Sequence, residues 1–363
     1  MAKLNIAVTG YFGTGSSAVI DLLREYQGVK VVPDMGRAYE HEIFYYPGGL
    51  FDLCSLLTHG NTPQGSDIYI NNFINTMHRL NDYDYGWFGS YQKLFGDKVM
   101  KMTEKFVSTI SEKREGTNSY HTVRSRKSLI KAALQLAAHL VYKRQILQYG
   151  IKYVKDNNPV YFALPTEDEL YKAAQEFTSS YFDLFNDPDG ISVYDHLIWP
   201  QQINAQQKCF TDNLKIIVVN RDPRDVFLSS KYVWCKPQTG GGSLGKPHFG
   251  EDPVPFVEEW KRTVVLQNTN PNAMHISFED LVYNYEKTIA RIEQFLGFTP
   301  DMHLCPKKYF NPERSIENTQ VFTGSDALKQ ESSYIERELK DYLYKFPYER
   351  ISKIANMFDS PNN

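Results

Sequence analysis

The N-terminal stretch "NIAVTGYFGTGSSAVIDLL", Asn5–Leu23, decides the fold prediction. An apolar run leads into a glycine-rich turn, and a helical pattern follows. Glycines at such a turn let backbone N–H groups approach one anion, and the helix N-terminus adds a positive dipole end. The spacing Gly-x4-Gly-Ser-Ser matches a P-loop in which Ser16 stands where nucleotide kinases and ATPases keep a lysine. The stretch therefore predicts an anion-binding loop, the alternative being a turn whose glycines serve packing alone.

Short apolar runs that are typical of buried parallel strands recur along the chain, with helical patterns between them. This alternation predicts an α/β fold, a three-layer sandwich with a mostly parallel central sheet, similar to P-loop nucleotide kinases. The predicted strands are Asn5–Thr9, Val29–Val32, Ile191–Tyr194, Lys215–Asn220 and Ala273–Phe278. The predicted helices are Asp21–Tyr26 (continuing the first helix), Ser128–Tyr149, Asp280–Leu296 and Glu331–Tyr344.

The pattern changes between Gly60 and Pro188, where polar, Tyr- and Asn-rich helical stretches dominate. We interpret the chain, residues 1–363, as a single domain with a large helical insertion at 60–188 that shapes a pocket for the acceptor. The Gly- and Pro-rich stretch Cys235–Pro255 is predicted to be a flexible loop, in the position of a lid.

Composition narrows the class of protein. The net charge of -3 lacks the basic excess that is typical of nucleic-acid-binding domains. The four cysteines form no CxxC pair, which argues against a zinc site or a redox dithiol. No apolar run approaches the roughly 20 residues that span a bilayer, and the first strand begins close to Met1, without room for a signal peptide. We therefore expect a cytoplasmic protein without a metal site or a transmembrane segment.

A second anion-binding element is predicted in "LKIIVVNRDPRDVFLSSKYVW", Leu214–Trp234. A buried strand ends at Asn220, which places Arg221 at its carboxyl end, where ligands bind in open α/β sheets. Ser229 follows eight residues later on a helix. A guanidinium fork and a hydroxyl so placed converge on one phosphate. The alternative is a capping aspartate, Asp222, with surface arginines.

This string resembles the 3′-phosphate-binding segment of sulfotransferases that use 3′-phosphoadenosine 5′-phosphosulfate (PAPS), in which Arg-[Asp/Asn]-Pro-x-Asp is followed by Ser eight residues after the Arg. "GYFGTGSS" resembles their 5′-phosphosulfate loop, and "HISFEDLVYNYEKTIARIEQFLGF", His275–Phe298, resembles their strand–helix segment. "PERSIENTQ", Pro312–Gln320, is similar to a late loop that closes over the nucleotide in bacterial members. The resemblance implies nucleotide contacts from Phe12, Gly13, Thr14, Gly15, Ser16, Ser17, Arg221, Ser229, Arg314 and Asn318.

One position departs from that pattern. The family's loop usually carries a Lys or Arg that touches the bridging oxygen as the sulfuryl group leaves, and here the equivalent position is Gly13 or Thr14. Arg37, just past the second predicted strand, is the first candidate for a replacement. The other candidates are Lys307, Lys308 and Arg314.

Sulfuryl transfer to a hydroxyl also needs a group that takes the proton. Glu42, in "YEHEIFYY", resembles the glutamate base of the glycan-sulfating branch, and Glu40 and His41 are its neighbours. Asp195 and His196 offer a second possibility at a strand end. For each of these residues the alternative interpretation is a solvated charge on a loop or a capping residue without a catalytic role. His248 is a weaker candidate in the Gly/Pro-rich loop.

The sequence thus predicts a PAPS-dependent sulfotransferase with a hydroxyl or amine acceptor, in a carbohydrate or glycolipid. Two alternatives stay open. An ATP-dependent small-molecule kinase would need Mg²⁺ and the P-loop lysine, and a non-catalytic nucleotide- or glycan-binding relative would explain the missing loop cation.

Overall fold

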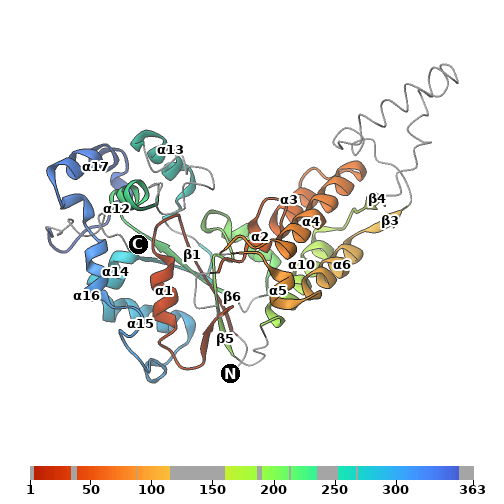
Figure 1. The fold of residues 1–363 in the computed structure, drawn as a ribbon, viewed down its shortest axis with the longest axis horizontal. Coiled ribbons are helices and arrows are strands. Elements are labelled where there is room, and N and C mark those ends of the chain that lie inside the picture. The colour runs from red at the N-terminus through yellow and green to blue at the C-terminus, as the bar shows by residue number, and fades with distance from the viewer. Residues whose placement is uncertain are drawn as a thin grey trace, which may run out of the picture. The chain divides into compact units, whose positions relative to one another are not determined.

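A computed structural model describes residues 4–33, 39–86, 88–114, 160–185, 190–211, 214–234, 252–266 and 269–350 (Figure 1). The chain divides into two compact units. The first unit comprises Met1–His41, Asp187–Gln207 and Asp212–Asn363, and the second comprises Glu42–Asn186 with Lys208–Thr211. Each unit is described here by itself.

The first unit is built on a five-stranded sheet in the order β2-β5-β1-β6-β7, with every neighbouring pair parallel. Its strands are β1 (Leu4–Gly10), β2 (Val29–Val31), β5 (Ile191–Asp195), β6 (Leu214–Asn220) and β7 (Ala273–Ser277). All five coincide with the predicted strands to within one residue at each end. The predicted α/β class with a parallel central sheet is confirmed.

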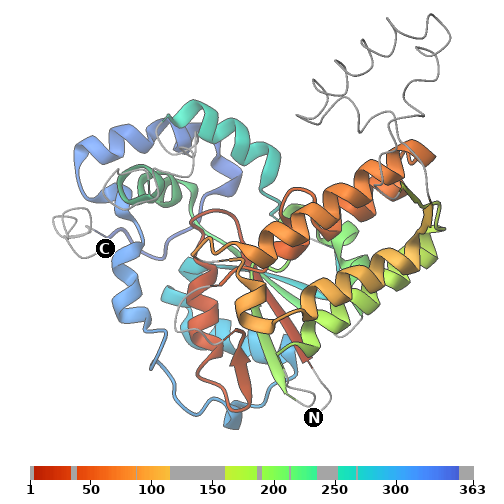
Figure 2. The ribbon, with the colours of Figure 1, turned by 45° about the vertical axis from the view of Figure 1, so that its right-hand side comes forward.

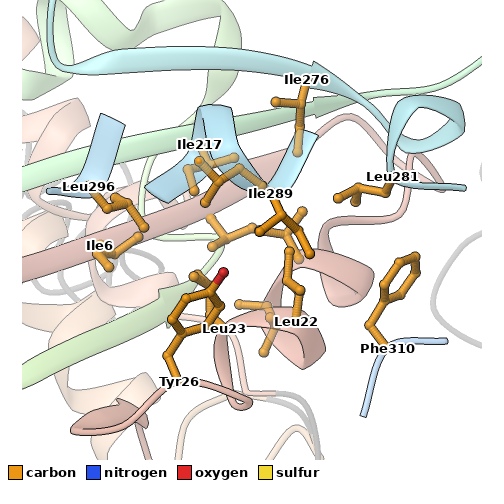
Figure 3. Close-up of a cluster of buried hydrophobic side chains, with 14 of the residues drawn as sticks. Ile6, Leu22, Leu23, Tyr26, Ile217, Ile276, Leu281, Ile289, Leu296 and Phe310 are labelled. Atoms are coloured by element: carbon orange, nitrogen blue, oxygen red, sulfur yellow. The ribbon is translucent and has the colours of Figure 1, made fainter. Parts of the chain in front are cut away.

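One face of this sheet carries the main core of the unit. Ile6 of the central strand β1 and Ile217 of its neighbour β6 belong to this layer and are fully buried. Three helices cover them: α1 (Ser16–Leu23), α14 (Phe278–Tyr283) and α15 (Tyr285–Leu296). Figure 3 shows Leu22 and Leu23 of α1 and Ile289 of α15 pointing into the same cluster. Burying one large apolar side chain contributes about 1.5–3 kcal/mol to the stability of the fold. This core therefore holds the strands, and the loops at their carboxyl ends, in fixed positions.

Among the remaining helices of the first unit, α12 packs against α17, and α17 also contacts α13, while α16 packs against α14 (Figure 1). Their bounds are α11 (Ile203–Gln206), α12 (Pro223–Ser229), α13 (Pro253–Thr263), α16 (Pro312–Ser315) and α17 (Asp326–Glu338). The short 3-10 turns of this unit are η1 (Pro200–Gln202), η6 (Pro300–Met302), η7 (Ile316–Asn318), η8 (Val321–Thr323) and η9 (Lys340–Tyr342), and η3 (Ser230–Trp234) is a π-helical turn that continues α12.

The second unit is mainly helical, and Figure 2 shows its long helices running side by side. Aromatic rings fill its core; Phe44 and Tyr181, for example, meet edge to face at 5.0 Å. The helices are α2 (Glu42–Tyr45), α3 (Leu50–Thr58), α4 (Pro63–Asp82), α5 (Tyr91–Phe95), α6 (Lys98–Ile110) and α10 (Glu167–Asp183), with the turn η2 (Gln207–Cys209). The strands β3 (Glu112–Arg114) and β4 (Val160–Phe162) form an antiparallel pair.

Several predicted helix bounds were wrong, for local reasons. The helix predicted at Asp280–Leu296 breaks at Asn284, whose backbone leaves the helical region with φ -126° and ψ 39°. The helix predicted at Glu331–Tyr344 begins five residues earlier, because the Ser325 side chain caps it by accepting from the N–H of Leu328, and it ends at Glu338.

The end of the predicted Gly/Pro-rich loop was also misplaced. Asp252 accepts from the N–H of Val254 and caps α13, so Pro253 is already the first helical residue. The rest of that loop up to residue 251, the predicted helix Ser128–Tyr149 and His248 lie outside the described residues. In the part of the chain that is described, no helix has the length and apolar character needed to cross a membrane.

Candidate active site

The glycine loop joins β1 to α1 at the carboxyl edge of the sheet. Gly13 and Gly15 adopt positive φ angles of 76° and 93°, which side-chain-bearing residues rarely adopt. A Cβ atom on Gly15 would also lie 3.0 Å from the ring of Phe278, the first residue of α14. The local sequence therefore allows a tight turn that brings the N-terminus of α1 to the sheet edge, with its dipole directed at the space beyond.

Thr14 shapes this loop from inside. Both its N–H and its hydroxyl donate to the carbonyl of Tyr11, at 3.0 and 2.7 Å, and its side chain is buried. The Tyr11 phenol in turn donates to the carbonyl of Val265 and accepts from its N–H, at 3.3 and 2.8 Å. The Thr14 hydroxyl is thus committed to the fold of the loop, and the prediction that Thr14 binds the nucleotide is not supported for its side chain.

The other loop residues differ in exposure. Ser16 is buried, whereas Ser17 is exposed. Phe12 is 57% exposed at the tip of the turn. Of the two hydroxyls that we expected to face an anion, that of Ser17 is the accessible one.

Arg221 connects three separate segments of the chain. It follows the last residue of β6, and its Nη1 donates to the carbonyl of Gly13 at 3.0 Å. Its Nη2 donates to the carbonyl of Asn318 at 2.6 Å and to the hydroxyl of Ser229 at 3.4 Å. The structure thus brings together four of the residues that sequence reasoning selected from segments up to about 300 positions apart: Gly13, Arg221, Ser229 and Asn318. The guanidinium also lies 5.3 Å from the centre of the Phe278 ring.

Two buried polar atoms at this strand end have no partner among the described residues. They are the Nε of Arg221 and the Oδ1 of Asn220. Leaving a buried donor unpaired costs about 1–3 kcal/mol. An oxygen of a bound phosphate could accept from this Nε–H. The residues at this strand end therefore suit an anionic ligand.

Buried carboxylates fix the residues around Arg221. Asp225, on α12, accepts from the N–H groups of Gln320 and Val321 at 2.8 and 2.7 Å, so it fixes the segment that follows Asn318. Burial, reinforced by the charge of Asp222, raises the pKa of Asp225 to about 7. Glu279 accepts from the N–H of Asp222 at 2.8 Å, and burial raises its pKa to about 8.

Asp195 and His196 stand at the carboxyl end of β5, next to the strand that leads into the glycine loop. Asp195 pairs in register with Val8, and the N–H of His196 donates to the Val8 carbonyl at 2.9 Å. The Nδ1 of His196 lies 2.8 Å from the Asp195 carboxylate. Glu40 forms a parallel bridge with Asp195 and is half-buried. A carboxylate at Nδ1 fixes the imidazole tautomer and its orientation.

His41 and Glu42 differ in their surroundings. His41 is fully buried, its Nε2 lies 3.1 Å from the Val32 carbonyl, and its ring meets Tyr194 edge to face. Burial lowers the pKa of His41 to about 3. A fully buried side chain has no access to a substrate, so His41 is withdrawn as a candidate base. Glu42 opens α2 and belongs to the second unit, so it stays a prediction from the sequence.

The side chains that could replace the missing loop cation lie at different distances along α1 from the glycine loop, or outside the described residues. Arg314, on α16, is close enough to Asp21 of α1 to lower the pKa of that carboxyl, although burial outweighs it and the net shift is upward. Lys307 belongs to a loop that Glu25 holds by accepting from its N–H at 3.0 Å. Because Glu25 follows the C-terminus of α1, this loop, which also carries Lys308, is anchored at the opposite end of α1 from the glycine loop. Arg37 lies outside the described residues.

Sequence reasoning missed two kinds of contact. Asp225 stood inside the recognised string, but its partners are almost a hundred residues away and gave no local signal. Tyr11 stood in the glycine loop, and its hydrogen bonds to Val265 follow from packing alone. Among the described residues, no group of three or more His, Cys, Asp or Glu side chains is arranged to hold a metal ion.

Solved structures with detectable similarity share little sequence with this chain. A sulfotransferase domain from the Synechococcus PCC 7002 olefin synthase is 12% identical, with a TM-score of 0.39, 95% of this chain and 96% of that one covered. The sulfotransferase STF9 from Mycobacterium avium is 12% identical, with a TM-score of 0.34 and coverage of 97% and 79%. A retinol dehydratase in complex with androsterone and inactive cofactor PAP is 14% identical, with a TM-score of 0.33 and coverage of 94% and 82%.

No curated protein sequence matches the chain significantly. The family assignment comes from the sulfotransferase domain model, which matches residues 175–359, just over half of the chain. The match includes Arg221, Ser229 and Asn318, which the structure brings together at the end of β6. The chain therefore belongs to the sulfotransferase domain family.

Proposed function

We propose that this protein transfers a sulfuryl group from PAPS to a hydroxyl or amine of a carbohydrate or glycolipid head group. The Tyr- and Asn-rich character of residues 60–188 supports this class of acceptor. The observation that carries the proposal is Arg221, which touches Ser229, the glycine loop and the Asn318 segment at once. Its unpartnered Nε–H adds a donor that an anion would satisfy. The spacing of four cysteines without a paired motif favours a reducing compartment, in keeping with the cytoplasmic setting expected from the sequence.

In this proposal the two anionic ends of the donor are held by different elements. Arg221 and Ser229 bind the 3′-phosphate, and the glycine loop with the N-terminus of α1 binds the phosphosulfate. PAPS supplies an activated sulfuryl group whose leaving group is a phosphate. The protein aligns the acceptor for in-line attack and receives its proton.

His196 is the proton acceptor that the first unit favours. Asp195 accepts from Nδ1–H, and in that tautomer Nε2 carries the lone pair that receives the proton of the acceptor. The resulting imidazolium is stabilised by the Asp195 carboxylate. Glu42, whose prediction rests on resemblance, is the alternative base, and Arg37 is the candidate for a loop cation.

The proposal is tested by binding and by turnover. Isothermal titration with adenosine 3′,5′-bisphosphate, adenosine 5′-monophosphate and ATP–Mg²⁺ should show clear preference for the bisphosphate, because only it carries the 3′-phosphate that Arg221 and Ser229 would bind. Preference for ATP–Mg²⁺ would favour the kinase alternative.

Transfer of labelled sulfate from PAPS is then measured on a panel of sugars, glycolipids, phenols and sterols. Binding of the bisphosphate without transfer to any acceptor would favour the non-catalytic relative, the alternative that Gly13 in place of a loop cation supports.

A further inference from the structure

The segment 316–323 carries the Asn318 carbonyl to Arg221. It consists of the turns η7 and η8, joined by Thr319 and by Gln320, whose φ of 54° is in the left-handed region. Thr319 and Gln320 are buried. A non-glycine residue in this conformation persists only where its surroundings hold it, so the contacts of this segment decide whether Asn318 stays in place.

Asp225 holds the segment from the side of α12. Its two carboxylate oxygens accept from the consecutive N–H groups of Gln320 and Val321. Asp225 lies four residues after Arg221, so this contact and the Arg221–Asn318 hydrogen bond come from the same stretch of chain.

Arg350 holds the same segment from the C-terminal side. Its Nη1 donates to the carbonyls of Ile316 and Thr319 at 2.6 and 3.4 Å, and its Nη2 pairs with the Glu317 carboxylate. Its backbone N–H donates to Oε1 of Gln320 at 2.8 Å, and its carbonyl accepts from the Thr323 hydroxyl. One residue thus bonds to five of the eight residues of the segment, on both sides of Asn318.

The Arg350 side chain is only 14% exposed. Charge-assisted hydrogen bonds shielded from water are stronger and more directional than exposed ones. The Ile316 and Thr319 carbonyls flank Asn318 along the chain, so the guanidinium fixes the backbone on either side of the carbonyl that meets Arg221.

We propose that Arg350 is a positioning residue for the nucleotide site. It does not touch the donor itself; it holds segment 316–323 in the conformation that sets Asn318 against Arg221. The inference rests on the proposed function, because it assigns this segment to binding of the 3′-phosphate-bearing nucleotide. Nothing in the sequence around Arg350 indicated such a role.

The test compares Arg350→Ala and Arg350→Lys with wild type, and Arg337→Ala is the matched control, because Arg337 is 65% exposed on α17 and pairs with its neighbour Glu338. Isothermal titration should show Arg350→Ala binding adenosine 3′,5′-bisphosphate roughly 5- to 30-fold more weakly. This loss is smaller than that for a charge-assisted hydrogen bond made to the ligand itself, because Arg350 acts only through segment 316–323. Arg350→Lys keeps the charge but not the fork, and should fall between Arg350→Ala and wild type. Arg337→Ala should bind as wild type does.

Two readouts separate positioning from general stability. With PAPS varied, Arg350→Ala should raise KM and leave kcat within about twofold, because the reacting groups are untouched. Hydrogen exchange in the free protein should speed up at the amides of Gln320 and Val321, and stay unchanged in β1 and β6. If Arg350→Ala does not fold, the same comparisons on Arg350→Lys decide.

The outcomes distinguish this inference from the proposed function. Wild-type protein that does not bind the bisphosphate would overturn both. Wild-type binding with unchanged affinity in Arg350→Ala, or equally fast exchange throughout the sheet, would overturn the positioning role and leave the sulfotransferase proposal standing.

Discussion

Replacing Arg221 by alanine tests the proposed nucleotide site most directly. The change removes a charge-assisted donor set, and one such hydrogen bond contributes about 1.5–3 kcal/mol. This predicts roughly 10- to 150-fold weaker binding of adenosine 3′,5′-bisphosphate. We expect the upper part of that range, because the same guanidinium also donates to the Gly13 carbonyl, the Asn318 carbonyl and the Ser229 hydroxyl, so its loss loosens the groups around the anion as well.

The assay is isothermal titration of wild type and Arg221→Ala with the bisphosphate and with adenosine 5′-monophosphate. The loss should be concentrated on the bisphosphate, since only this ligand has the 3′-phosphate. Ser229→Ala should cost about 1 kcal/mol on the same ligand, and Arg262→Ala, at a side chain that is 79% exposed on α13, serves as the control. Equal losses on both ligands, or unchanged bisphosphate affinity, would refute the assignment of Arg221 to the 3′-phosphate.

The remaining predictions concern the base, metals and pH. His196→Gln should lower kcat roughly 10²–10⁴-fold with near wild-type nucleotide affinity; if Glu42→Gln does so instead, the base belongs to the second unit. Activity should survive EDTA, and loss with rescue by Mg²⁺ would favour the kinase alternative. Glu279, with its pKa raised to about 8 by burial, keeps a proton that the unfolded chain loses near pH 4.3. The contribution of Glu279 to the free energy of unfolding of the wild type is therefore greatest in acid and falls as pH rises toward about 8. Between about pH 5 and 8.5, the melting temperature of Glu279→Gln should therefore fall less than that of the wild type. Parallel pH profiles of the two melting temperatures would contradict this.

The strands were predictable because each is a short apolar run between turn-forming residues, and burial in a parallel sheet requires such runs. Helix ends were less predictable, since they depend on single capping residues: Ser325 begins α17 earlier, and Asp252 begins α13 inside an apparent loop. Asn284 divides a helical pattern whose apolar spacing is continuous.

The site was predictable where its chemistry is local. Arg221 and Ser229 lie eight residues apart across a strand end and a helix, so their convergence follows from secondary structure. His41 shows the opposite case, because its neighbours in sequence are charged or polar, yet it packs into the core beside Tyr194. The contacts of Arg350 with residues 316–323 depend on tertiary packing, and no pattern in one sequence encodes them.

The missing loop cation can be reconsidered from the backbone at Gly13. A φ of 76° disfavours a lysine at this position in the present conformation, whatever space it has. The carbonyl of Gly13, and not a side chain, is what meets a positive charge, because Arg221 donates to it at 3.0 Å. The positive charge that contacts the loop thus comes from the end of β6, and the same guanidinium donates to Ser229 and Asn318. A guanidinium engaged in this way holds the loop, and in the proposed function it also orients the anion beside it. If the leaving phosphate needs a second cation at the glycine turn, that cation must come from another segment, which makes Arg37, six residues after the end of β2, the residue to examine in turnover experiments.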